Sequence, residues 1–219
     1  MIKIKRLTSA FALLIMALNA SLMHAQEEPI QAKKLDPRFN FFVEGKAIGN
    51  RVFQLGDAKN WSVDLQDGEG VSANGKLTVS ADDYRGKRDA LRLRWLRNQK
   101  VKTQLSLVGQ DINISAAKEF TALTIDLKLI KKPEKPVYIG LGCGYPCGAE
   151  VRIEKQLRHY PKGEWAALPI PLNCFESDDF DLSKINGPFT IHTEGKFEVS
   201  IANIRLERLP EGSKGCKTK

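Results

Sequence analysis

The sequence has little of what most catalytic and metal sites need. It has three histidines among 219 residues, which leaves little room for a histidine-rich metal site. No G-x-S-x-G motif is present, which argues against an α/β-hydrolase nucleophile. No nucleic-acid recognition motif accompanies the basic residues. We therefore expect a protein that is not an enzyme and that has no nucleic-acid partner.

Long apolar runs are confined to the beginning of the chain. The basic residues Lys3, Lys5 and Arg6 precede an apolar stretch from Leu7 to Leu18, and Ala25 is a suitable last residue before cleavage. This order predicts a secretory signal peptide over residues 1–25. The alternative, an N-terminal membrane anchor, would need a longer apolar run. We expect a periplasmic or extracellular location after cleavage, with no transmembrane segment.

Removal of that signal changes how the charge is interpreted. Residues 1–25 contain three of the 34 Lys+Arg and none of the 26 Asp+Glu, so the formal net charge falls from +8 to +5. A charge of that size does not define a partner. We predict a polar arm over residues 26–38, one folded domain over 39–210 and a polar tail over 211–219.

Period-two alternation dominates the predicted domain, whereas long amphipathic helices and βαβ spacing are lacking. Apolar residues alternate with polar ones in five segments, and such runs are typical of half-buried strands. The segments are 91–95, 123–129, 137–141, 165–172 and 196–209. Many short strands separated by turns predict an all-β, antiparallel sandwich.

Local signals add detail to this fold. Asn74-Gly75 between two strand-like segments predicts a hairpin with a two-residue turn. The parity of the apolar residues changes near Ala202-Asn203, which predicts a β-bulge. One or two short helical turns are expected, at 153–159 and 181–185.

The four cysteines are Cys143, Cys147, Cys174 and Cys216, and they allow three pairings. Structural disulfides suit an exported protein. Cys143 and Cys147 have C-x-x-x-C rather than C-x-x-C spacing, which argues against a thioredoxin-like redox site. A zinc site would need four convergent ligands, and Cys216 lies on a polar tail.

Several motifs resemble a known family. They are Gly142-Cys143-Gly144-Tyr145-Pro146-Cys147, Gly163-Glu164-Trp165, Ile170-Pro171-Leu172-Asn173-Cys174-Phe175, Asp181-Leu182-Ser183-Lys184-Ile185 and Asn203-Ile204-Arg205-Leu206. In this order they resemble the C-terminal galactose-binding-like domain of ExoP-type enzymes, which are family-3 glycoside hydrolases. The resemblance covers roughly Asn40 to Leu209. It implies a jelly-roll β-sandwich with a carbohydrate-related accessory role, and it does not imply hydrolase activity.

The resemblance also concerns a cation site. Asn203 stands where members of that family carry Asp, and the loss of that charge would weaken a Ca²⁺ site if the Asp were a ligand. The acidic clusters Asp82-Asp83 and Asp178-Asp179-Asp181 have oxygen ligands that Ca²⁺ prefers. Such clusters are more often turns and helix caps. We predict no cofactor, with Ca²⁺ as the alternative.

Candidate ligand contacts come from residues that combine exposure with suitable chemistry. Aromatic rings stack on sugar faces, and polar side chains orient the hydroxyls. Trp61 follows a turn and Tyr145 lies in a Gly/Pro/Cys loop, so we predict that both stack on a ligand. Arg92 and Asp83 are predicted to orient it. Trp95 shares the parity of apolar strand residues and is predicted to lie in the core.

Three hypotheses about function follow. The first is an exported, non-catalytic module that binds a polysaccharide or oligosaccharide or assists an exported glycoside hydrolase. The second is a structural domain that docks on another exported protein without direct sugar binding. The third, a small hydrolase, would require two carboxylates at a fixed separation.

Overall fold

The computed structural model describes residues 36–96, 101–213 and 215–216. All of the described residues belong to one compact unit. The predicted signal peptide, 1–25, and most of the predicted arm, 26–38, lie outside the described residues. Within the described part of the chain, no helix has the length and apolarity needed to cross a bilayer.

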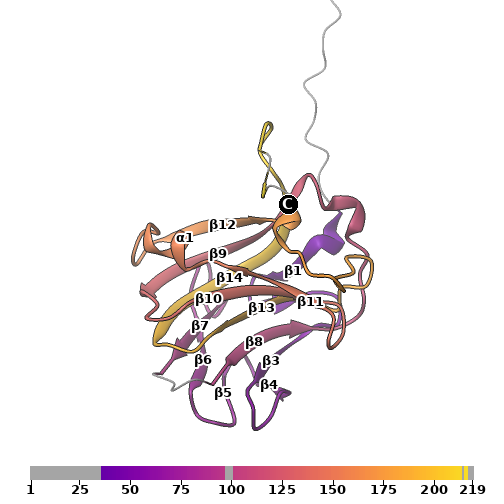
Figure 1. Ribbon diagram of the computed structural model, residues 1–219. Coiled ribbons are helices and arrows are strands. Elements are labelled where there is room, and N and C mark those ends of the chain that lie inside the picture. Colours follow the sequence, from indigo (N-terminus) through magenta and orange to yellow (C-terminus); the bar gives the residue numbers. More distant parts are fainter. Residues whose placement is uncertain (1–35, 97–100, 214, 217–219) are drawn as a thin grey trace, which may run out of the picture. The chain divides into compact units, whose positions relative to one another are not determined.

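Two antiparallel sheets make up the fold (Figure 1). The eight-stranded sheet consists of β1 (Asn40–Val43), β2 (Lys46–Ala47), β5 (Gly70–Val71), β6 (Leu77–Asp82), β7 (Ala90–Trp95), β9 (Thr121–Lys131), β12 (Trp165–Pro171) and β14 (Phe197–Arg208). The six-stranded sheet has the order β11 (Gly148–Arg152), β10 (Val137–Gly142), β13 (Gly187–Thr193), β8 (Thr103–Val108), β3 (Val52–Gly56) and β4 (Val63–Asp64). The predicted all-β, antiparallel sandwich is confirmed.

The core lies between the two sheets, where each strand places every second side chain. In β7, Leu91, Leu93 and Trp95 are buried, whereas Arg92 and Arg94 are exposed. The ring of Trp95 stacks on Phe197, and its indole N–H donates to the backbone oxygen of Thr103 at 2.9 Å. The predicted core position of Trp95 is therefore confirmed.

The predicted bulge in the last strand is also present. β14 changes its register against β9 between Ile201 and Ile204. Ile201 and Ile204 are both buried, so the extra residue restores the apolar face toward the core, as a bulge does.

The hairpin at Asn74-Gly75 forms, but its predicted two-residue turn is wrong. The backbone N–H of Ser72 donates to the oxygen of Leu77 at 2.9 Å, which leaves residues 73–76 in the loop. Inside the loop, the N–H of Gly75 donates to the oxygen of Ser72 at 2.7 Å. The longer loop turns the N–H of Asn74 toward the buried carboxylate of Asp57, at 2.8 Å.

The helical turns are short. α1 (Glu154–Arg158) lies in the predicted segment 153–159, which confirms that prediction. The segment 181–185 is no helix and contains a hydrogen-bonded turn, in which the N–H of Lys184 donates to the oxygen of Asp181 at 3.2 Å. The sequence did not predict the 3₁₀ turns η1 (Pro37–Phe39), η2 (Ser115–Ala117) and η3 (Leu172–Cys174).

All four cysteines form disulfides, as predicted. Of the three possible pairings, the structure has Cys143–Cys147 and Cys174–Cys216. The second disulfide attaches the C-terminal tail to η3, and the backbone N–H of Cys216 also donates to the side-chain oxygen of Asn173 at 3.2 Å. This part of the tail is thereby held against the sandwich.

Candidate functional site

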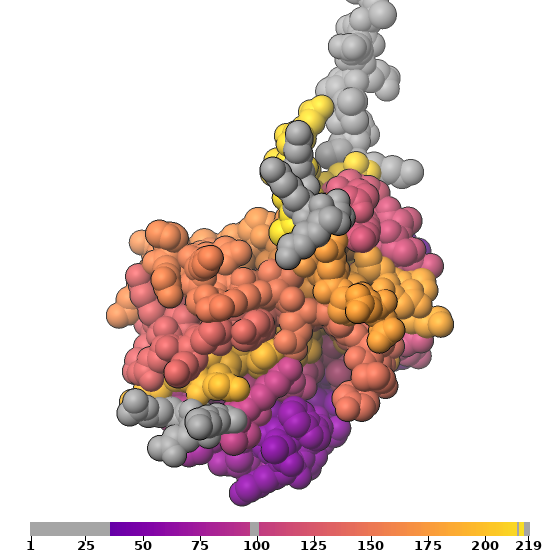
Figure 2. Space-filling model, in the orientation of Figure 1, coloured from indigo at the N-terminus to yellow at the C-terminus, as the bar shows by residue number. Residues whose placement is uncertain are grey.

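The outer face of the six-stranded sheet carries a hollow of about 680 Å³, which we call the main groove. Figure 2 shows this face of the molecule, recessed between the orange residues that connect β10 and β11 and the magenta and purple residues of β8 and β3. The groove is lined by Lys102, Gln104, Ser106, Val108, 140–142, 144–150, Glu176, Ser177, Asn186, Gly187 and Thr190.

Glycines make part of the groove floor. Gly142 of β10 pairs with Gly148 of β11 on one side and with Gly187 of β13 on the other. A Cβ placed on Gly187 would come within 3.5 Å of the Cα of Gly142. Three neighbouring strands thus lack side chains at one level, and the backbone itself forms the bottom of the hollow.

Uncharged polar groups line the wall along β8. Leu105 and Leu107 point into the core, so the alternation of the strand turns Gln104 and Ser106 outward. The hydroxyl of Ser106 accepts from the side chain of Gln104 and from the hydroxyl of Thr190, both at 3.1 Å. Hydroxyl and amide groups can both donate and accept hydrogen bonds, which suits a ligand that carries hydroxyls.

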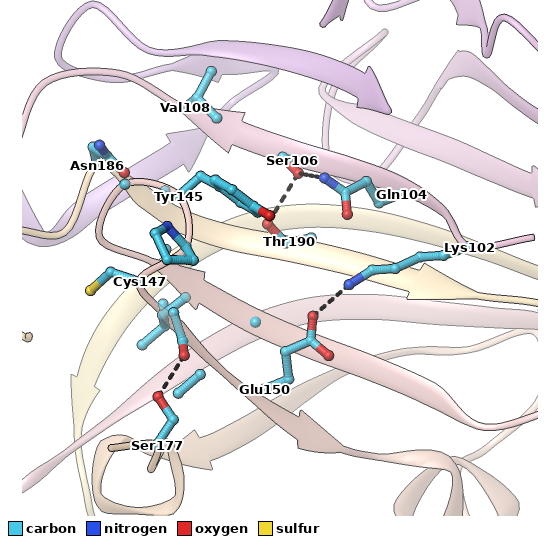
Figure 3. A pocket seen from close by; sticks show the side chains of 18 of the residues that line it. Lys102, Gln104, Ser106, Val108, Tyr145, Cys147, Glu150, Ser177, Asn186 and Thr190 are labelled. Atoms are coloured by element: carbon cyan, nitrogen blue, oxygen red, sulfur yellow. Dashed lines mark hydrogen bonds and ion pairs between the residues drawn. The ribbon is translucent and has the colours of Figure 1, made fainter. Parts of the chain in front are cut away.

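Tyr145 stands at one end of the main groove. The connection between β10 and β11 is closed by the Cys143–Cys147 disulfide and by a 3.1 Å hydrogen bond from the Cys143 N–H to the Cys147 oxygen. Tyr145 is fully exposed and lines the groove (Figure 3). A short, cross-linked loop thus presents an aromatic ring to solvent.

Trp61 borders the same sheet face from the β3–β4 connection, and 52% of its surface is exposed. A Cβ placed on Gly56 would come within 3.1 Å of both Trp61 Cε3 and Gln104 Cγ. The indole therefore lies over Gly56 and beside Gln104, and the missing side chain at position 56 makes room for it.

The buried carboxylate of Asp57 holds the Trp61 loop in place. Its Oδ1 accepts from the backbone N–H of Lys59 at 2.7 Å and of Asn60 at 3.2 Å, and its Oδ2 accepts from Asn74. Burial raises the pKa of this carboxyl, but the three backbone N–H groups lower it by more, so that the pKa lies below its ordinary value.

A charged cluster stands at the other end of the main groove. Glu150 Oε1 lies 2.8 Å from Lys102 Nζ, and Glu150 Oε2 lies 3.0 Å from His192 Nε2. The contact with His192 has the largest effect on the pKa of Glu150. Together the two contacts outweigh burial, which raises that pKa, and they lower it to about 2.

Lys102, His192 and Tyr138 also line a second hollow of about 130 Å³, which we call the end pocket.

Arg92 and Asp83 lie elsewhere. Arg92 is on the outer face of the eight-stranded sheet, where Nη2 lies 2.6 Å from Glu198 Oε1. Asp83 follows β6 and accepts the backbone N–H of Arg88 at 2.8 Å. Of the four predicted contact residues, the structure brings Trp61 and Tyr145 to one sheet face and places Arg92 and Asp83 with the other sheet.

The acidic clusters have local partners. Asp82 contacts the side chains of Ser200 and Lys128. Asp181 accepts the backbone N–H and the hydroxyl of Ser183, and Asn203 donates to Asp126 at 2.9 Å. Among the described residues, no group of three or more His, Cys, Asp or Glu side chains is arranged to hold a metal ion.

Most of the groove residues were not predicted from the sequence. Gln104 and Ser106 lie in the six-residue run 103–108, and Thr190 lies in 187–193, where polar and apolar residues also alternate. That alternation was available in the sequence. Which sheet each strand joins, and therefore which polar faces adjoin, was not.

Comparison with known proteins now identifies the family. The family model Exop_C, described as "galactose-binding domain-like", matches residues 53–206. The chain belongs to this family. The predicted resemblance to ExoP-type domains is thereby confirmed. Comparison with curated proteins gives no significant match.

Solved structures agree on the fold of this Exop_C member. The extra C-terminal domain of the exo-1,3/1,4-β-glucanase ExoP from a Pseudoalteromonas species matches with a TM-score of 0.65 and 17% identity, over 81% of this chain and 96% of that domain. Against the whole glucanase, the TM-score is 0.64 with 18% identity, and the match spans 86% of this chain but 22% of the enzyme.

A second kind of protein shares the architecture. The family 30 carbohydrate-binding module of a cellulosomal cellulase from Clostridium thermocellum matches with a TM-score of 0.56 and 17% identity, over 80% of this chain and 98% of the module. At these identities the likeness establishes the fold, a β-sandwich of galactose-binding-like type.

Proposed function

We propose that this protein is an exported, non-catalytic carbohydrate-binding module that takes an oligosaccharide or a polysaccharide segment in the main groove. The observation that carries the proposal is the hollow of about 680 Å³ on the six-stranded sheet. Part of its floor is bare backbone, and its β8 wall carries the uncharged polar side chains of Gln104 and Ser106. Ligand sites combine an exposed concavity with a few polar groups that fix orientation.

The aromatic side chains at the border support this reading. Trp61 and Tyr145 are exposed on the same sheet face. An exposed aromatic ring offers the apolar face of a sugar a large contact area with little loss of side-chain freedom. We assign stacking to these two rings, and hydrogen bonding to Gln104, Ser106 and Thr190.

The Glu150 carboxylate in the groove supports a non-catalytic role. A glycosidase general acid needs a raised pKa so that it holds its proton near neutral pH. Glu150 shows the opposite shift, to about 2, because His192 and Lys102 stabilise its charged form. We infer that Glu150 is a structural and charge-balancing group and not a proton donor.

The partner and the location follow from the same proposal. The matched glucanase is named for 1,3/1,4-β-glucan and the matched module for carbohydrate binding. Oligosaccharides with such linkages are therefore the first ligands to test, with an exported glycoside hydrolase as a candidate protein partner. Two disulfides fit an oxidising compartment, and we propose the periplasm or the extracellular space.

Binding to immobilised polysaccharides and calorimetric titration with soluble oligosaccharides test the proposal. Gly140→Val is the variant that should fill the groove. Gly140 lines the groove between Glu150 and Thr190, and a Cβ there would lie 3.3 Å from Glu150 Cγ and 3.7 Å from Thr190 Cβ. Valine suits a strand, so we expect a folded protein that has lost at least about tenfold in affinity. Absence of glycan binding by the wild type would refute the proposal.

A further inference from the structure

The side chain of Glu150 crosses the main groove. Glu150 belongs to β11, and a Cβ placed on Gly140 in the neighbouring strand β10 would come within 3.3 Å of its Cγ. Beyond β10, the carboxylate reaches β13, where Oε2 lies 3.0 Å from His192 Nε2. Gly140 has no side chain, and this leaves the space through which Glu150 passes.

Lys102 meets this carboxylate from the opposite side of the groove. Lys102 directly precedes β8, and β8 is separated from β11 by both β10 and β13. Its Nζ lies 2.8 Å from Glu150 Oε1. Figure 3 shows the two side chains extending toward each other from different segments of the chain. The ion pair therefore spans the width of the groove.

The ion pair stands between two hollows. Lys102 and Glu150 both line the main groove, and Lys102 also lines the end pocket together with Tyr138 and His192. The rings of Tyr138 and His192 stack at 4.9 Å between centroids. The end pocket thus contains an aromatic surface and polar groups of its own, on the far side of the Lys102–Glu150 contact.

We propose that the Lys102–Glu150 ion pair is a partition that sets the length of glycan the main groove accepts, with Lys102 as the specificity-determining residue. This inference rests on the proposed glycan binding. A ligand that ends before the partition uses the main groove alone. A longer ligand reaches the surface of Tyr138 and His192 only when Lys102 moves aside.

The partition is easily opened. The Lys102 and Glu150 side chains are 39% and 41% exposed, and exposed ion pairs contribute little to stability. His192 is buried and contacts Glu150, so we expect Glu150 to keep this partner when Lys102 is removed. Removing the ammonium group should therefore join the two hollows and leave the sheet intact.

Lys102→Met tests the partition. Lys184→Met is its matched control, because Lys184 also pairs with an acidic side chain, Asp181, but lines neither hollow. Affinities are measured for a ladder of β-1,3/1,4-linked gluco-oligosaccharides from disaccharide to octasaccharide. For the wild type and Lys184→Met, affinity should stop rising at an intermediate length. For Lys102→Met, affinity should continue to rise with ligand length. The ratio of Lys102→Met affinity to wild-type affinity should therefore be about threefold or more larger for the longest ligand than for the shortest.

Two outcomes would overturn the inference and leave the proposed glycan binding intact. One is the same length dependence in Lys102→Met and in the wild type. The other does not involve glycan: NMR titration of the Glu150 carboxyl should show a higher pKa in Lys102→Met than in the wild type, and an unchanged pKa would mean that no partition forms. A different result would separate the proposed function from the ion pair. If the wild type binds no member of the ladder but the Glu150 pKa is still higher in Lys102→Met, the proposed function fails and the ion pair is only a structural contact. The length-selection proposal then ends as well.

Discussion

Asp57 Oδ2 accepts the backbone N–H of Asn74 at 2.8 Å, although the two residues are 17 positions apart in the chain. The other oxygen of this buried carboxylate accepts from Lys59 and Asn60. One side chain thereby joins the hairpin after β5 to the loop that carries Trp61. The position of a candidate sugar-stacking ring thus depends on a buried residue that does not line the main groove.

Asp57→Ala should destabilise the fold by about 3 kcal/mol, because three backbone N–H groups lose a charged acceptor. It should also weaken glycan binding through disorder of the Trp61 loop. Urea unfolding and calorimetric titration measure the two effects. Asp64→Ala is the control, since Asp64 is exposed and accepts from the Gln54 side chain, and we expect a change below about 0.5 kcal/mol. Equal destabilisation by both variants would contradict the assigned role.

Trp61→Ala and Tyr145→Ala should each reduce glycan affinity by about 1–2 kcal/mol, with little change in thermal stability, because both rings are exposed. Phe120→Ala is the matched control: Phe120 is also exposed, but it lies beside Arg208 and not in the groove. Wild-type affinity in both Trp61→Ala and Tyr145→Ala would remove these rings from the site. The same assay on Arg92→Met tests whether the eight-stranded sheet contributes to glycan binding. We expect no change in affinity, because Arg92 is paired with Glu198 on that sheet.

The contribution of Glu150 to stability should depend on pH. The pKa of Glu150 is about 2 in the folded protein against an ordinary value of 4.5. The group therefore stabilises the fold fully above pH 4.5, and this contribution is lost as the pH falls toward 2. The stability difference between wild type and Glu150→Gln, followed by urea unfolding, should shrink over that interval. A constant difference would show that the contacts with His192 and Lys102 do not stabilise the charged carboxylate.

The Cys174–Cys216 disulfide should matter more than the Cys143–Cys147 disulfide. Its cysteines are separated by 42 positions, against four for the other pair. In the chain-entropy model the longer loop contributes about 4 kcal/mol and the shorter about 2 kcal/mol. The double variants Cys174→Ser/Cys216→Ser and Cys143→Ser/Cys147→Ser, compared by thermal unfolding, test this order. A larger loss in the second variant would contradict it.

Much of the sandwich could be predicted because the alternation of polar and apolar residues along a strand indicates which side chains are buried. Trp95, the β14 bulge and the α1 turn follow from parity or local pattern, and the structure confirms them. The Asn74-Gly75 turn differs from the prediction because a distant carboxylate, Asp57, accepts the N–H of Asn74. Local sequence does not contain that partner.

The candidate site was only partly accessible from the sequence. The exposed aromatics Trp61 and Tyr145 could be chosen from their loops. The crossing of Glu150 over Gly140 depends on the order β11-β10-β13-β8. A glycine in one strand and a charged residue in the next carry no signal of contact until the strand order is known.

Backbone NMR of the labelled protein, titrated with a soluble β-1,3/1,4-linked gluco-oligosaccharide, tests the central claim most directly. We predict saturable chemical-shift changes concentrated at Gln104, Ser106, Tyr145 and Thr190, with little change around Arg92 on the other sheet. Changes centred on Arg92, or no change with any oligosaccharide tested, would contradict the assignment of the main groove as a glycan-binding site.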